Sequence, residues 1–308
     1  NAMISVVVGS ARPESFASPP ASQDEASQLT GVRVLVAEDN PVNRELVHHM
    51  LAQLGADSLM ATNGFEALDV LTRDSVDLVL MDCQMPELDG YQATKRLREI
   101  ESRAGQSRVP VIALTANALA GDRERCLTAG MDDYLPKPFT RKELLALVRR
   151  WVDRESSASD RRGAATRTAP GITSVIGARA GSPALDPAVL ASLRSLDSEG
   201  GDTLVARLAR LFREDAQLRR EQLRRAYDES NAELLRSAAH AFKSSSANMG
   251  ARALAELCRK IETQTLGGEI PDSCAGLLVE LEHEHARVDD CVSQILATAD
   301  AAVEHSAA

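Results

Sequence analysis

Aromatic residues are scarce in this chain of 308 residues, in which phenylalanine, tyrosine and tryptophan together make up 3%. Binding of nucleobases by aromatic stacking is therefore not expected. The chain also lacks net positive charge, because its formal net charge is −10, and this argues against nucleic-acid binding. No apolar stretch approaches the roughly 18 residues of a membrane-spanning helix, so we expect no membrane contact by this fragment.

Cysteine pairs and nucleotide-binding loops are missing as well. The five cysteines are scattered without a Cys-x-x-Cys pair, which favours reduced thiols over a disulfide framework or a zinc site. We therefore expect a cytoplasmic fragment, which is compatible with a longer parent chain anchored in the inner membrane. The sequence contains neither Gly-x-x-x-x-Gly-Lys nor a glycine-rich kinase lid, so the fragment should not phosphorylate itself from ATP.

Composition divides the chain into two domains with flexible segments around them. Residues 1–30 begin with an apparent tag scar and continue as a flexible lead-in rich in serine, proline and alanine. Residues 31–152 form the first predicted domain and residues 184–300 the second. Residues 153–183 carry many Ser, Ala, Gly, Thr and Arg residues without a helical stripe, which predicts a linker. Residues 301–308 are expected to form a tail.

The first domain alternates short apolar runs with helical patterns. Strands are predicted near 32–36, 57–61, 77–81, 110–114 and 134–135, and helices near 41–54, 64–73, 90–101, 118–129 and 141–152. Asn40 followed by Pro41 is a typical start of the first helix, a capping side chain before a proline at the first helical position. Five such units predict an α/β fold, a flavodoxin-like doubly wound parallel sheet.

The second domain has no strand pattern. After a short helix that begins at 186–187, long amphipathic helices are predicted over 202–227, 231–249, 251–266 and 271–297, with glycines at 200–201, 250 and 267–268. Four such helices with short connections predict an antiparallel four-helix bundle. A bundle of this kind can also serve only as a docking or dimerisation module.

Five polar residues follow the predicted strands of the first domain, where the ends of parallel strands converge on one crevice. They are Glu38, Asp39, Asp82, Thr115 and Lys137. Three carboxylates in one crevice repel one another and need a cation, and an open all-oxygen site suits Mg²⁺. The hydroxyl and the ammonium group can hold the other oxygens of a phosphoryl group, with Asp82 as the nucleophile that forms an acyl phosphate. Taken singly, each residue could instead be a helix cap, a loop residue or a surface charge.

Residues 31–152 closely resemble the receiver domain of two-component response regulators. The resemblance rests on Val-Leu-Val-Ala-Glu-Asp-Asn at 34–40, Met-Asp-Cys-Gln-Met-Pro-Glu-Leu-Asp-Gly at 81–90, Ala-Leu-Thr-Ala-Asn-Ala at 113–118 and Tyr-Leu-Pro-Lys-Pro-Phe at 134–139. It implies that Asp82 accepts the phosphoryl group. It also implies that Glu38, Asp39, Asp82 and the backbone carbonyl of Gln84 surround Mg²⁺.

The same resemblance implies a conformational response to phosphorylation. Thr115 would move toward the phosphate and Tyr134 would change rotamer. Lys137 would bridge to a phosphoryl oxygen, and the peptide bond between Lys137 and Pro138 would be cis. No acceptor, metal or switch position departs from the family pattern.

The second long helix of the bundle carries a histidine off its apolar stripe. That stripe is predicted to be Leu235, Ala238, Phe242, Ser245 or Ser246, and Met249. His240 lies on another face, near the small residues Ser244 and Ala247, where a large partner could reach it. Lys243, three residues on, brings a positive charge to any phosphate on the ring. An ordinary exposed histidine is the alternative interpretation.

This segment resembles the histidine-phosphotransfer (HPt) domain over about 184–300. The hallmark is His-x-x-Lys followed by small residues, an apolar residue and glycine, here His240, Lys243, 244–246, Met249 and Gly250. The family usually has glycine directly after the lysine, whereas this chain has Ser244, and we expect only modest crowding. His283 and His285 lie two residues apart and are expected on different faces, as surface residues rather than a metal pair.

Together the two resemblances predict a phosphorelay module. Asp82 would accept a phosphoryl group from an upstream kinase histidine and pass it to His240. His240 would then transfer it to the receiver of a downstream response regulator, with reverse steps also possible. A linker of about 30 residues spans roughly 30 Å, which permits docking within one chain at about millimolar effective concentration. Transfer between chains remains open.

The domain order most resembles the C-terminal end of a hybrid sensor histidine kinase, so the parent chain would be a protein-histidine kinase. A stand-alone relay protein is the alternative. Two other functions are alternatives. A phosphatase with an aspartyl nucleophile would need a general acid two residues after Asp82, where Gln84 stands. An adaptor with an inert bundle would use neither Asp82 nor His240 for chemistry.

Overall fold

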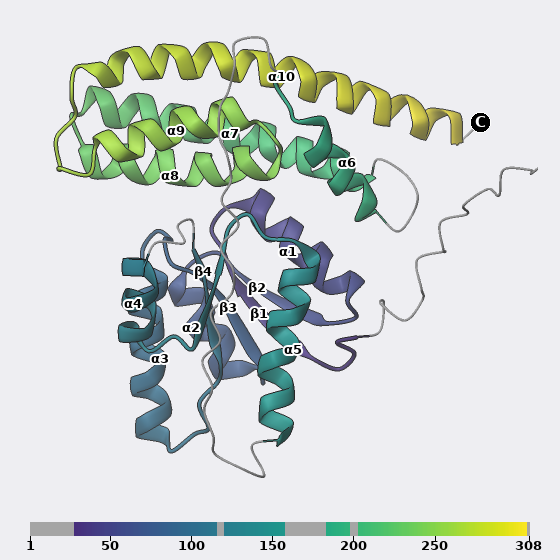
Figure 1. Ribbon diagram of the computed structural model, residues 1–308, viewed down its shortest axis with the longest axis vertical. Helices are drawn as coiled ribbons and strands as arrows, with labels where there is room; N and C mark the ends of the chain where they lie inside the picture. The colour runs from purple at the N-terminus through teal and green to yellow at the C-terminus, as the bar shows by residue number, and fades with distance from the viewer. Residues whose placement is uncertain (1–27, 116–119, 158–182, 198–202, 307–308) are drawn as a thin grey trace, which may run out of the picture.

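The computed structural model describes residues 28–115, 120–157, 183–197 and 203–306 (Figure 1). The predicted tag scar, and most of the predicted lead-in and linker, lie outside these ranges. The first part of the chain contains the strands β1 (Arg33–Ala37), β2 (Asp57–Ala61), β3 (Leu78–Asp82), β4 (Val111–Thr115) and β5 (Asp133–Pro136). They form one parallel sheet in the order β2-β1-β3-β4-β5. The predicted doubly wound α/β fold is confirmed.

Helices cover both faces of this sheet, and they alternate with the strands. They are α1 (Pro41–Gln53), α2 (Gly64–Arg73), α3 (Gly90–Ala104), α4 (Ala120–Ala129) and α5 (Arg141–Ser157). Side chains of α1 and α5 pack against one face, and those of α2, α3 and α4 against the other. All five residues of β3 are buried, as expected of a strand covered on both sides.

The second part of the chain contains helices and no strand in its described residues. It contains α6 (Pro187–Ser195), α7 (Thr203–Asp228), α8 (Ala232–Asn248), α9 (Arg252–Gln264) and α10 (Ser273–Ser306). The last four form the bundle, in which α8 packs against α7 and α9, and α10 against the same two helices. No helix in the described ranges is long and apolar enough to cross a membrane.

Two helices extend beyond the predicted ends. Helix α5 continues to Ser157 instead of ending at 152, so the predicted linker begins with five helical residues. Helix α10 continues to Ser306 instead of ending at 297, so most of the predicted tail is helical. Neither extension contains a glycine or proline to stop the helix, and the alanines after 297 have the highest helix propensity of any residue.

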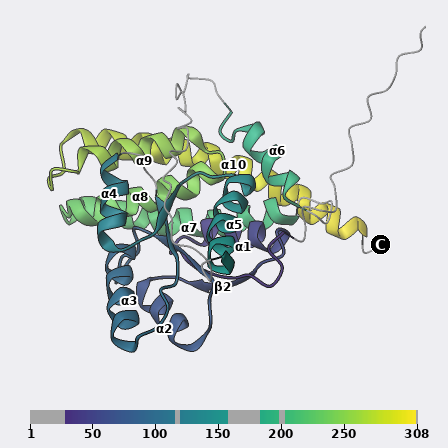
Figure 2. The same cartoon turned by 60° about the horizontal axis from the view of Figure 1, so that its bottom comes forward.

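The bundle lies against the first domain through α1. Helix α1 contacts both α7 and α8, and in Figures 1 and 2 these helices lie beside α1 at one end of the sheet. One continuous group of buried apolar side chains runs from the α1 and α5 face of the sheet into the bundle. The sheet domain and the bundle are therefore docked on each other.

Candidate phosphotransfer site

Three carboxylates meet at the carboxyl ends of β1 and β3. Glu38 and Asp39 follow β1, and Asp82 is the last residue of β3. Each offers an oxygen within 4.8 Å of the others. The Nζ of Lys137, just after β5, lies 2.5 Å from Glu38 Oε2 and 2.7 Å from Asp82 Oδ2. Sequence reasoning predicted this cluster, and the structure brings these four residues together.

The electrostatics of the cluster favour binding of a divalent cation. Burial raises the pKa of Asp39 to about 6, and the Glu38 charge adds to the effect. Burial also raises the pKa of Asp82, with Lys137 opposing and Glu38 adding to it. Even with the Arg219 guanidinium beside Asp39, the Lys137 ammonium leaves the three carboxylates with an excess of negative charge, and an all-oxygen donor set of this kind suits Mg²⁺. The residues present therefore fit the predicted metal.

The structure places the other predicted residues on, or just after, β3, β4 and β5. Thr115 is buried at the end of β4, and its carbonyl accepts a hydrogen bond from the Lys137 backbone at 2.6 Å. The Gln84 backbone N–H donates to Asp82 Oδ1 at 3.2 Å. Tyr134 is half-buried on β5, beside Ala113.

The loop after β3 passes very close to the end of that strand. A Cβ atom on Gly90, the first residue of α3, would lie 2.1 Å from the backbone oxygen of Asp82. Only glycine permits this approach, and the close approach fixes the start of α3 beside the carboxylate.

In the loop after β5, the Lys137–Pro138 peptide bond is cis, as the family resemblance implied.

His240 on α8 is held by a carboxylate that the sequence did not reveal. Its Nδ1 lies 2.7 Å from Glu262 Oε1 on α9, and the Lys243 ammonium pairs with the other oxygen of Glu262. Although burial opposes it, the contacts with His240 and Lys243 lower the pKa of Glu262 to about 2. Glu262 is therefore an acceptor, and the Nδ1 atom of His240 carries the proton.

The Nε2 atom of a neutral His240 is thus left with a free lone pair. Burial lowers the pKa of His240, the bond to Glu262 opposes this, and the Lys243 charge lowers the pKa further. The Lys137 ammonium adds a smaller effect in the same direction. An unprotonated nitrogen is the form that can act as a nucleophile.

The predicted stripe of α8 is confirmed, since all of its members are buried. His240 lies off this stripe, as predicted, but its side chain is only 14% exposed. The interpretation of His285 as a surface residue is wrong. It is buried, with its ring centroid 6.4 Å from that of Phe242, whereas His283 is exposed.

Polar contacts join α8 of the bundle to α1 beside the acidic cluster. Asn43 Nδ2 donates to Glu38 Oε1 at 2.9 Å and to Ser244 Oγ at 2.8 Å. Asn248 Nδ2 donates to Asn43 Oδ1 at 2.7 Å. Ser244 is one helical turn from His240, so a single asparagine contacts both the carboxylate cluster and the face of the histidine helix.

A second group of contacts joins α7 to the start of α1. The Oδ1 of Asn40 caps α1, and its Nδ2 donates to Asp215 at 2.8 Å. Asp215 is buried and also accepts from Ser245 Oγ and Arg219 Nε, each at 3.0 Å. Arg219 in turn reaches Asp39 Oδ2 at 3.2 Å. The two domains are joined by hydrogen bonds and ion pairs at the edge of the candidate site.

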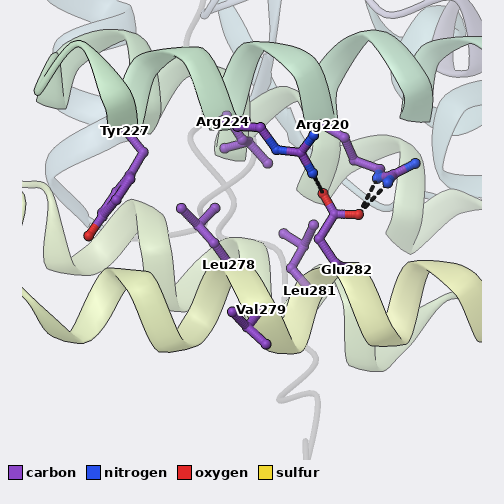
Figure 3. A pocket seen from close by; sticks show the side chains of 8 residues that line it. Arg220, Arg224, Tyr227, Leu278, Val279, Leu281 and Glu282 are labelled. Atoms are coloured by element: carbon purple, nitrogen blue, oxygen red, sulfur yellow. Dashed lines mark hydrogen bonds and ion pairs between the residues drawn. The ribbon is translucent and has the colours of Figure 1, made fainter.

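A small pocket elsewhere on the bundle is separate from these groups. It lies between α7 and α10, where Leu278, Val279 and Leu281 form an apolar wall (Figure 3). Arg220 and Arg224 both pair with Glu282 across it. None of the residues predicted to take part in phosphotransfer lines it.

Comparison with known proteins identifies a family for each of the two parts of the chain. Residues 34–149 match the response regulator receiver domain, and residues 207–298 match the Hpt domain. The chain therefore contains a receiver domain followed by an HPt domain, a phosphorelay module homologous to regions of hybrid sensor histidine kinases.

Two curated relatives and two solved structures illustrate the similarity. The sensor protein GacS of Pseudomonas syringae is 42% identical over 120 residues, 39% of this chain and 13% of GacS. The sensor histidine kinase RcsC of Escherichia coli is 36% identical over 141 residues, 46% of this chain and 14% of RcsC. The chain thus spans about one seventh of the length of these relatives.

The magnesium-bound receiver domain of the sensor histidine kinase PA1611 from Pseudomonas aeruginosa is 47% identical, with a TM-score of 0.36. The match covers 40% of this chain and 99% of that one. A co-crystal structure of Saccharomyces cerevisiae Ypd1 with the Ssk1 receiver domain gives 30% identity and a TM-score of 0.40. It covers 41% of this chain and 92% of that chain.

Proposed function

We propose that Asp82 accepts a phosphoryl group from the histidine of an upstream kinase domain and that His240 then receives it from Asp82. The observation that carries this proposal is the position of Asn43, which donates to both Glu38 and Ser244. It links the carboxylate cluster around Asp82 to the face of α8 that carries His240. From His240 the group would pass to the receiver of a separate response regulator.

In the first step, an oxygen of Asp82 attacks the phosphorus atom and forms an acyl phosphate, and the donor histidine leaves with its electron pair. Lys137 lies against Asp82 Oδ2 and is placed to neutralise charge on the incoming group. Glu38, Asp39, Asp82 and the carbonyl of Gln84 would hold Mg²⁺, which would screen negative charge on the phosphoryl oxygens. Thr115 and Tyr134 would respond to phosphorylation.

In the second step, the lone pair on His240 Nε2 attacks the phosphorus atom, and the P–O bond to Asp82 breaks. Asp82 recovers its carboxylate, and the ring becomes positively charged with its proton still on Nδ1. Glu262 accepts a hydrogen bond from that Nδ1–H and stabilises the charge. Lys243 offers its own positive charge to the phosphoryl oxygens.

A labelling experiment tests this proposal. The wild-type chain, Asp82→Asn and His240→Gln are incubated with Mg²⁺ and a small phosphodonor, and the phosphorylated residues are mapped. We expect acid-labile label on His240 in the wild type and none there in either variant. Label that loads Asp82 but never reaches His240 would refute the relay. Sustained turnover of a phosphomonoester would favour the phosphatase.

The kinase partner and the whole parent protein belong to the same proposal. The similarity to GacS and RcsC supports an origin in a hybrid sensor histidine kinase. In such a parent the upstream kinase domain belongs to the same polypeptide. A kinase domain that phosphorylates Asp82 when joined to this chain would support that origin.

A further inference from the structure

Arg219 of the bundle holds two carboxylates that belong to different domains. Its Nε donates to Asp215 on its own helix at 3.0 Å, and its terminal nitrogen donates to Asp39 at 3.2 Å. The side chains of Arg219 and Asp39 are 12% and 13% exposed. A charge pair that is this buried is poorly screened by salt.

Asp39 is also the member of the acidic cluster that Lys137 does not contact. Lys137 pairs with Glu38 and Asp82, so Arg219 is the cation paired with Asp39 in the docked arrangement. A divalent cation and a guanidinium group that share one carboxylate repel each other. The repulsion is strongest where the groups are shielded from water, because the dielectric constant is lower there.

We propose that Arg219 competes with Mg²⁺ for Asp39, so that docking of the bundle and Mg²⁺ binding weaken each other. This inference rests on the proposed function in one respect, the role of Asp39 as a Mg²⁺ ligand. Two sites linked in this way affect each other by the same factor. Mg²⁺ binding would therefore weaken docking of the bundle, and a docked bundle would lower the affinity of the receiver for Mg²⁺.

The contacts around Arg219 explain how the effect reaches the rest of the interface. Asp215 positions the guanidinium and at the same time accepts from Asn40, the residue before Pro41 at the start of α1. Asn40 directly follows Asp39 in the chain. A shift of Asp39 toward a metal ion therefore acts on two interdomain contacts, Arg219–Asp39 and Asp215–Asn40.

Nuclear magnetic resonance of the full, unphosphorylated chain tests the inference. MgCl₂ is titrated into the wild type and Arg219→Gln, and the backbone amides of Cys83 and Gln84 report binding. We expect the variant to bind Mg²⁺ about five- to tenfold more tightly, within the usual range of coupling between linked sites. Arg220→Gln is the matched control, because Arg220 pairs with Glu282 on α10 (Figure 3), and it should bind Mg²⁺ like the wild type.

The wild-type titration gives a second answer that does not depend on the variant. The amides of Ser244 and Asn248 should shift with the same midpoint as those of Cys83 and Gln84, because docking loosens as Mg²⁺ binds. Equal or weaker Mg²⁺ affinity in Arg219→Gln, or bundle amides that do not respond, would overturn the inference. Since no phosphoryl group is present, failure of the relay would leave this result unchanged.

Discussion

The Nδ2 of Asn43 lies 2.8 Å from the hydroxyl oxygen of Ser244, across the interface between the receiver and the HPt bundle. The HPt family usually has glycine at the position of Ser244, and the sequence suggested only modest crowding there. The serine instead adds a hydrogen bond to α1. In this chain the residue one turn after His240 takes part in recognition of its own receiver.

Ser244→Ala should slow transfer from Asp82 to His240 within the chain. A lost hydrogen bond of this kind costs about 1 kcal/mol, which corresponds to a roughly fivefold lower rate constant if docking limits transfer. Rapid-quench measurement of phosphohistidine formation gives the rate. Ser237→Ala, an exposed position on the same helix, is the control. Equal rates in the two variants would show that the Asn43–Ser244 bond contributes nothing.

The pair formed by Arg207 on α7 and Glu45 on α1, 2.7 Å apart, tests the docked arrangement without touching the acidic cluster. Arg207→Glu or Glu45→Arg alone places like charges together and should slow transfer by up to about fivefold, since exposed pairs contribute about 0.2–1 kcal/mol. The double variant restores opposite charges and should recover most of the wild-type rate. Additive losses in the double variant would contradict this contact.

Glu262→Gln should alter the histidine without removing it. In the wild type, ¹⁵N chemical shifts should report the Nδ1-protonated tautomer of neutral His240, with a pKa below 6.5 because of burial. The contact with Glu262 opposes that shift, and Lys243 would lose its partner, so the variant should have a still lower pKa and a mixed tautomer. An unchanged tautomer would remove Glu262 from the mechanism.

The same carboxylate should make stability depend on pH. The pKa of Glu262 is about 2 in the folded chain and near 4.5 in the unfolded one. Its stabilising contribution is therefore complete above pH 4.5 and is lost as pH falls toward 2. The difference in unfolding free energy between the wild type and Glu262→Gln should shrink over that range, as measured by denaturant titration. A constant difference would contradict the assigned shift.

Gly90→Ala should destabilise the receiver, because the new Cβ would overlap the Asp82 carbonyl oxygen. Overpacking of this kind costs about 1–3 kcal/mol, and the displaced loop should also slow phosphorylation of Asp82. Gly267→Ala is a suitable control, since a Cβ there meets nothing within 4 Å. Thermal unfolding of both variants measures the effect, and equal melting temperatures would refute the close approach.

The strand-end residues could be predicted because topology alone brings them together. Once the sheet is parallel, Glu38, Asp39, Asp82 and Lys137 must lie at one edge, whatever the details of packing. The stripe of α8 followed from helical periodicity in the same way. These features depend only on the spacing of residues along the chain, which can be read directly from the sequence.

Residues that depend on how one helix is rotated against another could not be predicted. Glu262 is one of two acidic residues on α9, and only the packing of α9 on α8 turns it toward His240. Arg219 and Asp39 are 180 residues apart and meet only through docking of the domains. The spacing of His283 and His285 indicated two different faces, but not that one of them packs against Phe242.

The central claim is that phosphate on Asp82 is passed to His240 of the same chain. The most direct measurement loads Asp82 with a small phosphodonor, removes the donor, and follows both phosphorylated residues by rapid quench at several protein concentrations. The account predicts that aspartyl phosphate falls and phosphohistidine rises with one shared rate constant that is independent of concentration. Decay of aspartyl phosphate to inorganic phosphate without any phosphohistidine at His240 would contradict it.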